Sequence, residues 1–239
     1  MKKLMVVILV LFVTFTVSAQ RSEVGLFGGV SYYNGDINPN NQFELSKKPF
    51  AYGLFYRYNF DTRLAIKLGY TKGELLGNKD FSFSDNGTSD NNISFTTSIN
   101  ELSAQFEVNF YDFSINGDGN RISPYIFGGM GLNFYNGTAK YSDVLLPTVV
   151  TRPPTYPMKD NNTINGSCVS FPFGLGVKYC PFPNVTTGLE WGMRKTTTDK
   201  LDGVYTDPYR VSAANDWYSF AGFWISFRIN FFNSERCYY

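Results

Sequence analysis

The chain has 239 residues and almost balanced charge, with 21 Lys and Arg against 20 Asp and Glu. This balance, without a basic cluster, argues against nucleic acid as a partner. The sequence contains no histidine, which excludes imidazole metal ligands and catalytic mechanisms that use a histidine base. We therefore expect no enzymatic activity, no cofactor and no metal ion.

The first 19 residues have the composition of a secretory signal peptide. Lys2 and Lys3 are followed by an apolar run, Leu4–Phe15, and by the small residues Val17-Ser18-Ala19 before Gln20. The apolar run is shorter than the roughly 20 residues that a membrane-spanning helix needs. The sequence therefore predicts a signal peptide over residues 1–19, a structured region over 20–232 and a C-terminal tail over 233–239.

Eight segments alternate apolar and polar side chains, as β-strands with two different faces do. In chain order they are Glu23–Tyr33, Ala51–Phe60, Arg63–Thr71, Thr97–Tyr111, Ile122–Tyr135, Cys168–Tyr179, Val185–Arg194 and Trp217–Phe231. The last segment is 15 residues long, and its odd positions, including Phe223, Ile225 and Phe227, form an apolar aromatic face. A tilted membrane strand needs about 9–11 residues, so this segment is long enough to cross a bilayer.

The connections between these segments alternate between short and long. The short ones are residues 61–62, about ten residues around 116–119, and residues 180–184, whereas the long ones are 34–50, 72–96, 136–167 and 195–216. Membrane barrels show this alternation because their periplasmic turns are short and their extracellular loops long. A soluble sandwich gives no reason for it.

A lipocalin-like barrel is the alternative fold with the same alternating strands. Its apolar side chains point inside and its charged side chains point into water. The Gly- and Ser-rich polar faces and the alternating connections favour the membrane barrel. The sequence thus predicts an all-β fold in the cell outer membrane: an eight-stranded antiparallel transmembrane outer-membrane β-barrel with long extracellular loops and short periplasmic turns.

Eight strands enclose only enough space for side chains, so the polar faces place seven charged residues in one narrow lumen. These residues are Arg57, Lys67, Glu101, Glu107, Lys178, Glu190 and Arg228. Because buried charges persist only when they are paired, we expect a salt-bridge network that plugs the barrel. An ion or proton path is the functional alternative, although open aqueous pores belong to barrels of roughly 16 strands or more.

The cysteines allow one disulfide within the chain. Cys168 and Cys180 stand at opposite ends of the sixth segment, about 40 Å apart at ~3.3 Å per residue, and cannot bond to each other. Cys237 lies in the tail on the same side as Cys180, in a compartment that permits disulfides. We expect a Cys180–Cys237 disulfide, with an intermolecular bond from Cys237 or free thiols as alternatives.

The last long connection, residues 195–216, contains four aspartates: Asp199, Asp202, Asp207 and Asp216. Carboxylates are suitable ligands for calcium, so these residues offer a candidate calcium site. Aspartate also forms turns in solvated loops, and we favour this simpler interpretation.

Three segments resemble a known family. They are Ser31-Tyr32-Tyr33-Asn34-Gly35-Asp36-Ile37-Asn38-Pro39, then Gly53-Leu54-Phe55-Tyr56-Arg57-Tyr58-Asn59, and a third that runs from Glu190-Trp191-Gly192-Met193-Arg194-Lys195-Thr196 through residues 198–205 to Asn215-Asp216-Trp217-Tyr218. Together they resemble the PorG-type outer-membrane barrels of the type IX secretion system, over nearly the whole mature chain.

The resemblance implies a non-enzymatic component of the outer membrane that anchors or organises a periplasmic ring of a PorK-type lipoprotein and a PorN-type protein. The tail residues Arg236, Cys237, Tyr238 and Tyr239 are also similar to the family and would face such a ring. Because the family includes paralogues of unknown role, a generic small barrel for adhesion or envelope stability is the alternative. We favour a structural role for Arg57, Glu190 and Arg194 of these segments, as members of the lumen network, over direct contact with a partner.

Overall fold

The computed structural model describes residues 22–35, 49–82, 90–114, 120–141, 162–198, 200–201 and 215–229. The expected signal peptide and the expected tail lie outside the described residues, so both stay predictions. In the described part, no helix is long and apolar enough to cross a membrane.

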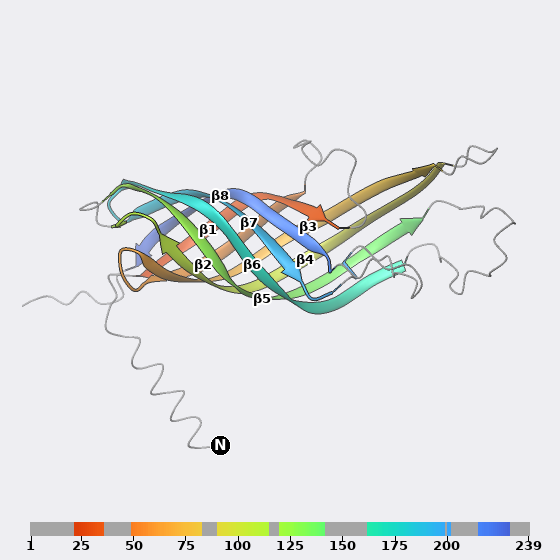
Figure 1. Cartoon of the computed structure of the whole chain (residues 1–239), viewed down its shortest axis with the longest axis horizontal. Coiled ribbons are helices and arrows are strands. Elements are labelled where there is room, and N and C mark those ends of the chain that lie inside the picture. Colours follow the sequence, from red (N-terminus) through yellow and green to blue (C-terminus); the bar gives the residue numbers. More distant parts are fainter. Residues whose placement is uncertain are drawn as a thin grey trace, which may run out of the picture.

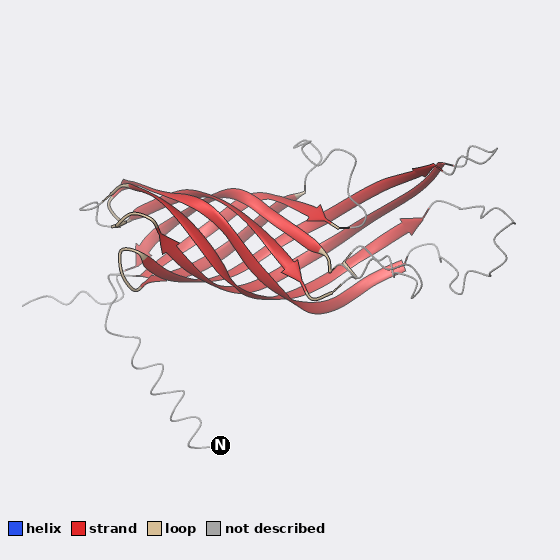
Figure 2. Cartoon of the chain, in the orientation of Figure 1, coloured by secondary structure: helices blue, strands red, loops and turns tan. Residues whose placement is uncertain are grey.

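Eight antiparallel strands form one closed barrel (Figure 1). They are β1 (Ser22–Asn34), β2 (Phe50–Asn59), β3 (Leu64–Ser82), β4 (Asp90–Asn109), β5 (Ile122–Tyr141), β6 (Asn162–Phe182), β7 (Val185–Thr196) and β8 (Trp217–Ile229). Each strand pairs with its neighbours in chain order, and β1 closes the barrel against β8. The regular structure of the described part consists of strands (Figure 2). The predicted fold class is confirmed.

Four strands are longer than the sequence predicts. β3 has 19 residues, β4 and β5 have 20 each and β6 has 21, whereas β1, β2, β7 and β8 have 10 to 13. The added residues are rich in Gly, Asn, Ser and Thr, which predict loops. They continue as strands because each finds an antiparallel partner, so that β3 and β4 stay paired out to Ser82 and Asp90. The four strands project beyond the others at one end of the barrel (Figure 1).

The outer wall of the barrel is apolar. Leu26, Leu175 and Leu189 point outward and are 60%, 54% and 64% exposed, and Phe223 and Phe227 of β8 are also exposed, as predicted. Such a wall is unfavourable in water but suits the hydrocarbon of a membrane. Closure of the barrel gives the backbone N–H and C=O groups of the edge strands hydrogen-bond partners, which lipid cannot supply.

The polarity of the outward positions orients the barrel. On the projecting strands these positions become polar, with Asn136 on β5 and Thr163, Asn165 and Ser167 on β6 all exposed. This end carries the long connections and is the extracellular one. At the opposite, periplasmic end the first residue of β1, Ser22, pairs with the last residue of β8.

Position along the outer wall yields a prediction for stability. Leu175→Arg places a cation in the hydrocarbon near the middle of the wall and should destabilise the barrel by about 2–4 kcal/mol. Asn136→Arg, above the apolar belt, should leave stability almost unchanged. Denaturant unfolding from liposomes, followed by heat-modifiable gel mobility, measures both, and equal losses would contradict the assignment of the lipid-facing wall.

Candidate functional site: a filled lumen between two exposed ends

Six charged side chains from six strands meet inside the periplasmic half of the lumen. They are Glu23 of β1, Arg57 of β2, Lys67 of β3, Glu107 of β4, Lys178 of β6 and Glu190 of β7, all buried. We call this set the central charge cluster. Its three carboxylates and three cations balance, which is the arrangement that buried charges require.

Glu107 is the hub of the central charge cluster. Its carboxylate lies 2.9 Å from Arg57 Nε, 2.7 Å from Lys178 Nζ and 3.6 Å from Lys67 Nζ. Arg57 reaches on to Glu23, at 3.3 Å, and Lys67 reaches on to Glu190, at 2.6 Å. The ion pairs therefore form one continuous chain across the lumen.

Uncharged side chains donate further hydrogen bonds to Glu23 and Glu190, the carboxylates at the two ends of this series of ion pairs. Glu23 accepts hydrogen bonds from Asn59 Nδ2 at 2.7 Å and from Ser226 Oγ at 2.5 Å. Glu190 accepts one from the Tyr125 hydroxyl at 2.7 Å. These bonds offset the cost of removing each carboxylate from water.

Aromatic rings fill the space around the cations. The Arg57 guanidinium lies 4.3 Å from the centre of the Trp224 ring, and Lys178 Nζ lies 4.6 Å from that of Tyr125. Lys67 Nζ lies 5.1 Å from the ring centre of Phe127. These are cation–π distances, so the rings stabilise the cations while they occupy volume that water would need.

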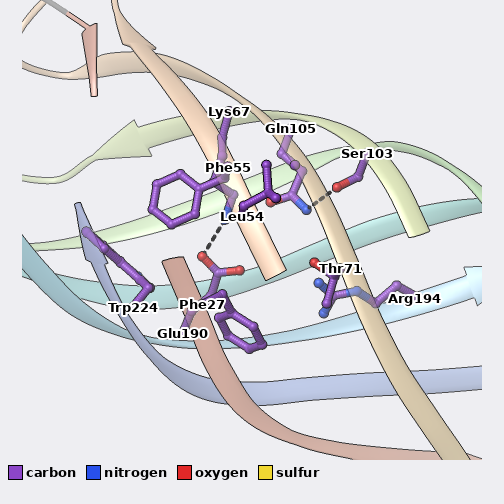
Figure 3. Close-up of a pocket in the computed structure, with 11 residues that line it drawn as sticks. Phe27, Leu54, Phe55, Lys67, Thr71, Ser103, Gln105, Glu190, Arg194 and Trp224 are labelled. Atoms are coloured by element: carbon purple, nitrogen blue, oxygen red, sulfur yellow. Dashed lines mark hydrogen bonds and ion pairs between the residues drawn. The ribbon is translucent and has the colours of Figure 1, made fainter. Parts of the chain in front are cut away.

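A second charged group lies nearer the extracellular end. Arg194 Nε is 3.3 Å from Glu101 Oε2, and the Tyr218 hydroxyl donates to the same oxygen at 2.6 Å. Between this group and the central charge cluster lies a cavity of about 20 Å³, lined by residues that include Gln105, Arg194 and Glu190 (Figure 3). A cavity of that size holds about one water molecule, so this cavity, as the described residues line it, is too small to be an aqueous path.

The extracellular half of the lumen is closed by an apolar plug. Its buried members are Tyr33, Ala51, Leu75, Phe95, Ile99, Tyr135, Ala139, Ile164, Leu201, Tyr218 and Phe220. Leu201 comes from the connection that follows β7 and is fully buried. Burial of these side chains away from water stabilises the closed mouth.

Asp216 holds Leu201 in the plug. Its carboxylate accepts a hydrogen bond from the Tyr33 hydroxyl at 2.6 Å and another from Leu201 N–H at 2.9 Å. Asp216 is therefore engaged in closing the mouth. Asp199, Asp202 and Asp207 lie outside the described residues, and no group of metal-ligating side chains occurs within the described part.

The periplasmic turns contact one another. Phe113 N–H donates to Thr62 C=O at 3.2 Å, and Arg63 Nε lies 2.6 Å from Asp112 Oδ1 in an exposed ion pair. The hydrogen bond and the charge of Arg63 hold the pKa of the Asp112 carboxyl below its ordinary value. These contacts join the β2–β3 turn to the β4–β5 connection, so that the two form one continuous surface.

Five of the seven predicted lumen charges, Arg57, Lys67, Glu107, Lys178 and Glu190, belong to the central charge cluster. Glu101 belongs to the separate extracellular group. Arg228 stands at the periplasmic end of β8, where its Nη1 donates to Asn184 Oδ1 at 3.3 Å. The seven predicted charges therefore lie at different heights along the lumen, and a single network that includes all seven stays a prediction.

Glu23 belongs to the central charge cluster but is not among the seven predicted lumen charges. It lies on the lumen side of β1 and is in register with Arg57 of β2 and Arg228 of β8. The alternation of β1 was a signal for its inward direction. The apolar plug was missed as well, because part of it lies in strand extensions that were expected to be loops.

The predicted disulfide stays a prediction. Cys180 is buried at the periplasmic end of β6, where its Sγ donates to Phe182 C=O at 3.2 Å. Cys237 and its neighbours Arg236, Tyr238 and Tyr239 lie outside the described residues.

The model of one protein family, a domain of unknown function termed DUF6089, matches residues 2–239. The chain belongs to the DUF6089 family. No curated protein matches it. Among solved structures, Neisserial surface protein A is similar with a TM-score of 0.51 and 11% identity, over 87% of this chain and 97% of that one.

Two further solved structures are similar over most of their length. A major outer-membrane protein of Thermus thermophilus has a TM-score of 0.46 and 14% identity, over 86% of this chain and 98% of that one. The attachment invasion locus protein Ail of Yersinia pestis has a TM-score of 0.42 and 14% identity, over 87% and 99%. The likeness to the Neisserial protein shows a shared fold. With its apolar wall and closed strand ladder, the DUF6089 chain is a small β-barrel protein of the bacterial outer membrane.

The hub position of Glu107 yields a second prediction. Glu107→Gln keeps the side-chain shape but leaves three buried cations without their shared carboxylate, which should cost about 3–5 kcal/mol of unfolding free energy. Asp112→Asn, which removes an exposed partner, should leave the unfolding midpoint unchanged. Urea titration of both variants in the same lipid distinguishes them, and an unaltered midpoint for Glu107→Gln would refute the hub role.

Proposed function

We propose that this protein is a non-enzymatic, non-conducting barrel that acts through its exposed ends, in adhesion or in envelope stability. The filled lumen carries the proposal. The central charge cluster occupies the periplasmic half, the apolar plug occupies the extracellular half, and the cavity between them is about 20 Å³.

The remaining surfaces support the same conclusion. The apolar outer wall suits lipid, which is therefore one partner of the protein. The projecting parts of β3, β4, β5 and β6 carry exposed polar residues beyond the apolar belt. Binding functions reside disproportionately on segments that a rigid scaffold presents, and this barrel presents its longest ones outside the cell. The chain has no histidine, which argues against hydrolytic chemistry that needs a histidine base.

This proposal predicts where deletions matter. The purified protein in planar bilayers should show no single-channel conductance at neutral pH. Replacing residues 142–161 by a short Gly-Ser linker should weaken cell attachment or envelope resistance to detergent, whereas deleting residues 233–239 should not. Stable conductance steps, or a phenotype from the tail deletion alone, would contradict it.

A place in the type IX secretion machinery is the second candidate, and the three segments that resemble the PorG-type barrels favour it. Arg57, Glu190 and Arg194 of these segments lie inside the barrel, so they serve its closure rather than partner contact. Contact with a periplasmic ring would fall to the periplasmic turns and to the tail residues Arg236, Cys237, Tyr238 and Tyr239.

Affinity purification of the tagged full chain from native outer membranes tests this second candidate. A PorK-type lipoprotein and a PorN-type protein should co-purify, and deletion of residues 233–239 should release them while replacement of residues 142–161 does not. A clean deletion strain without paralogues that still secretes its full set of proteins would count against this role.

A further inference from the structure

Among the described residues, one edge of the projecting sheet has no neighbouring strand. β6 pairs with β5 from Asn162 onward, but its ladder with β7 begins only at Ser170. Residues 162–168 therefore form an edge, as far as the structure is described. Thr163, Asn165 and Ser167 are exposed there, above the apolar belt.

The contacts of Val169 show which backbone groups face the open side. Val169 N–H donates to Thr197 Oγ1 at 3.2 Å, and Val169 C=O accepts from Thr197 N–H at 2.9 Å. In a strand, the N–H and C=O of every second residue point to the same side. Ser167, Asn165 and Thr163 thus direct their N–H and C=O groups to the side where β7 has ended.

Residues 162–168, the described part of this edge, contain no charge and no proline, two features that usually protect a strand edge. Natural edges carry charges, prolines or bulges that prevent pairing with another chain. Residues 162–168 read Asn-Thr-Ile-Asn-Gly-Ser-Cys, without a charge or a proline. The opposite edge, on β3, carries Glu74, whose C=O accepts a hydrogen bond from Ser31 Oγ.

We propose that residues 163–167 of β6 bind an extended, uncharged segment of a polypeptide outside the cell, which adds to the sheet as one more strand. The inference rests on the proposed function at the extracellular end and names its partner class. The segment is uncharged because the edge offers no charge to pair with one, and its backbone would satisfy the outward groups of Thr163, Asn165 and Ser167.

A second copy of the chain does not fit this edge. Two barrels inserted in the same direction would each tilt β6 by about 35–45° from the barrel axis. Facing each other, the two strands would cross at a large angle and share almost no ladder. A flexible segment of a different polypeptide can align with the strand.

Two proline substitutions test the inference. Asn165→Pro removes an N–H that faces the open side and leaves the ladder with β5, a position where edge strands tolerate proline. Asn78→Pro is the matched control on β3, because Asn78 shares the backbone direction of Glu74. The probe is a capped synthetic peptide of about eight residues that alternates Thr and Val, a usual strand length, added to the full-length protein in lipid nanodiscs.

The peptide should bind the unmodified protein and slow amide hydrogen exchange at Thr163, Asn165 and Ser167. Asn165→Pro should weaken binding by about tenfold or more, and Asn78→Pro should leave it unchanged. The exchange pattern of the unmodified protein serves as an independent readout if a variant does not fold.

Three results would overturn the inference: edge amides already protected before the peptide is added, equal binding by Asn165→Pro, or equal weakening by both variants. If any of these results occurs and replacement of residues 142–161 still gives a surface phenotype, the strand-addition inference is refuted and the proposed function stands. Absence of that phenotype would remove the proposed function itself.

Discussion

The rest of this structure depends on one constraint, that hydrocarbon offers no hydrogen bonds to a backbone. Strands can cross lipid only when every edge is paired, so β1 must close onto β8. Closure with eight strands leaves a lumen that side chains fill. Inward-pointing side chains then fill the lumen above and below one small cavity. Any charged side chain buried there must pair with another group of the protein.

Glu107 shows how the chain meets that requirement. Its contacts with Arg57, Lys67 and Lys178 join β2, β3, β4 and β6 through one carboxylate. Buried ion pairs often add little net stability compared with apolar side chains of the same size. Their effect here is on register, because a shift of one residue turns each inward charge toward lipid. The cluster thus selects one way of closing the barrel.

The two ends of the barrel have different structures because different constraints act on them. At the periplasmic end, short turns contact each other through pairs such as Arg63 with Asp112. At the extracellular end, Leu201 and Asp216 close the mouth, while β3 to β6 continue past it. With the interior filled, interactions with other molecules fall to these ends and to the lipid-facing wall.

Much of the barrel follows from the sequence alone, since the two-residue period and the connection lengths are local properties. They determined the strand number, the lipid-facing side of β8 and the inward direction of Arg57, Lys67, Glu107, Lys178 and Glu190. Only the tertiary structure decided which charges meet, because height along the lumen depends on the register of tilted strands. It placed Glu101 beside Arg194 and Arg228 at the periplasmic end of β8, added Glu23 to the central charge cluster, and placed Leu201 of a connecting segment in the plug. It also lengthened β3 to β6, since polar residues become strands when a neighbouring chain satisfies their backbone.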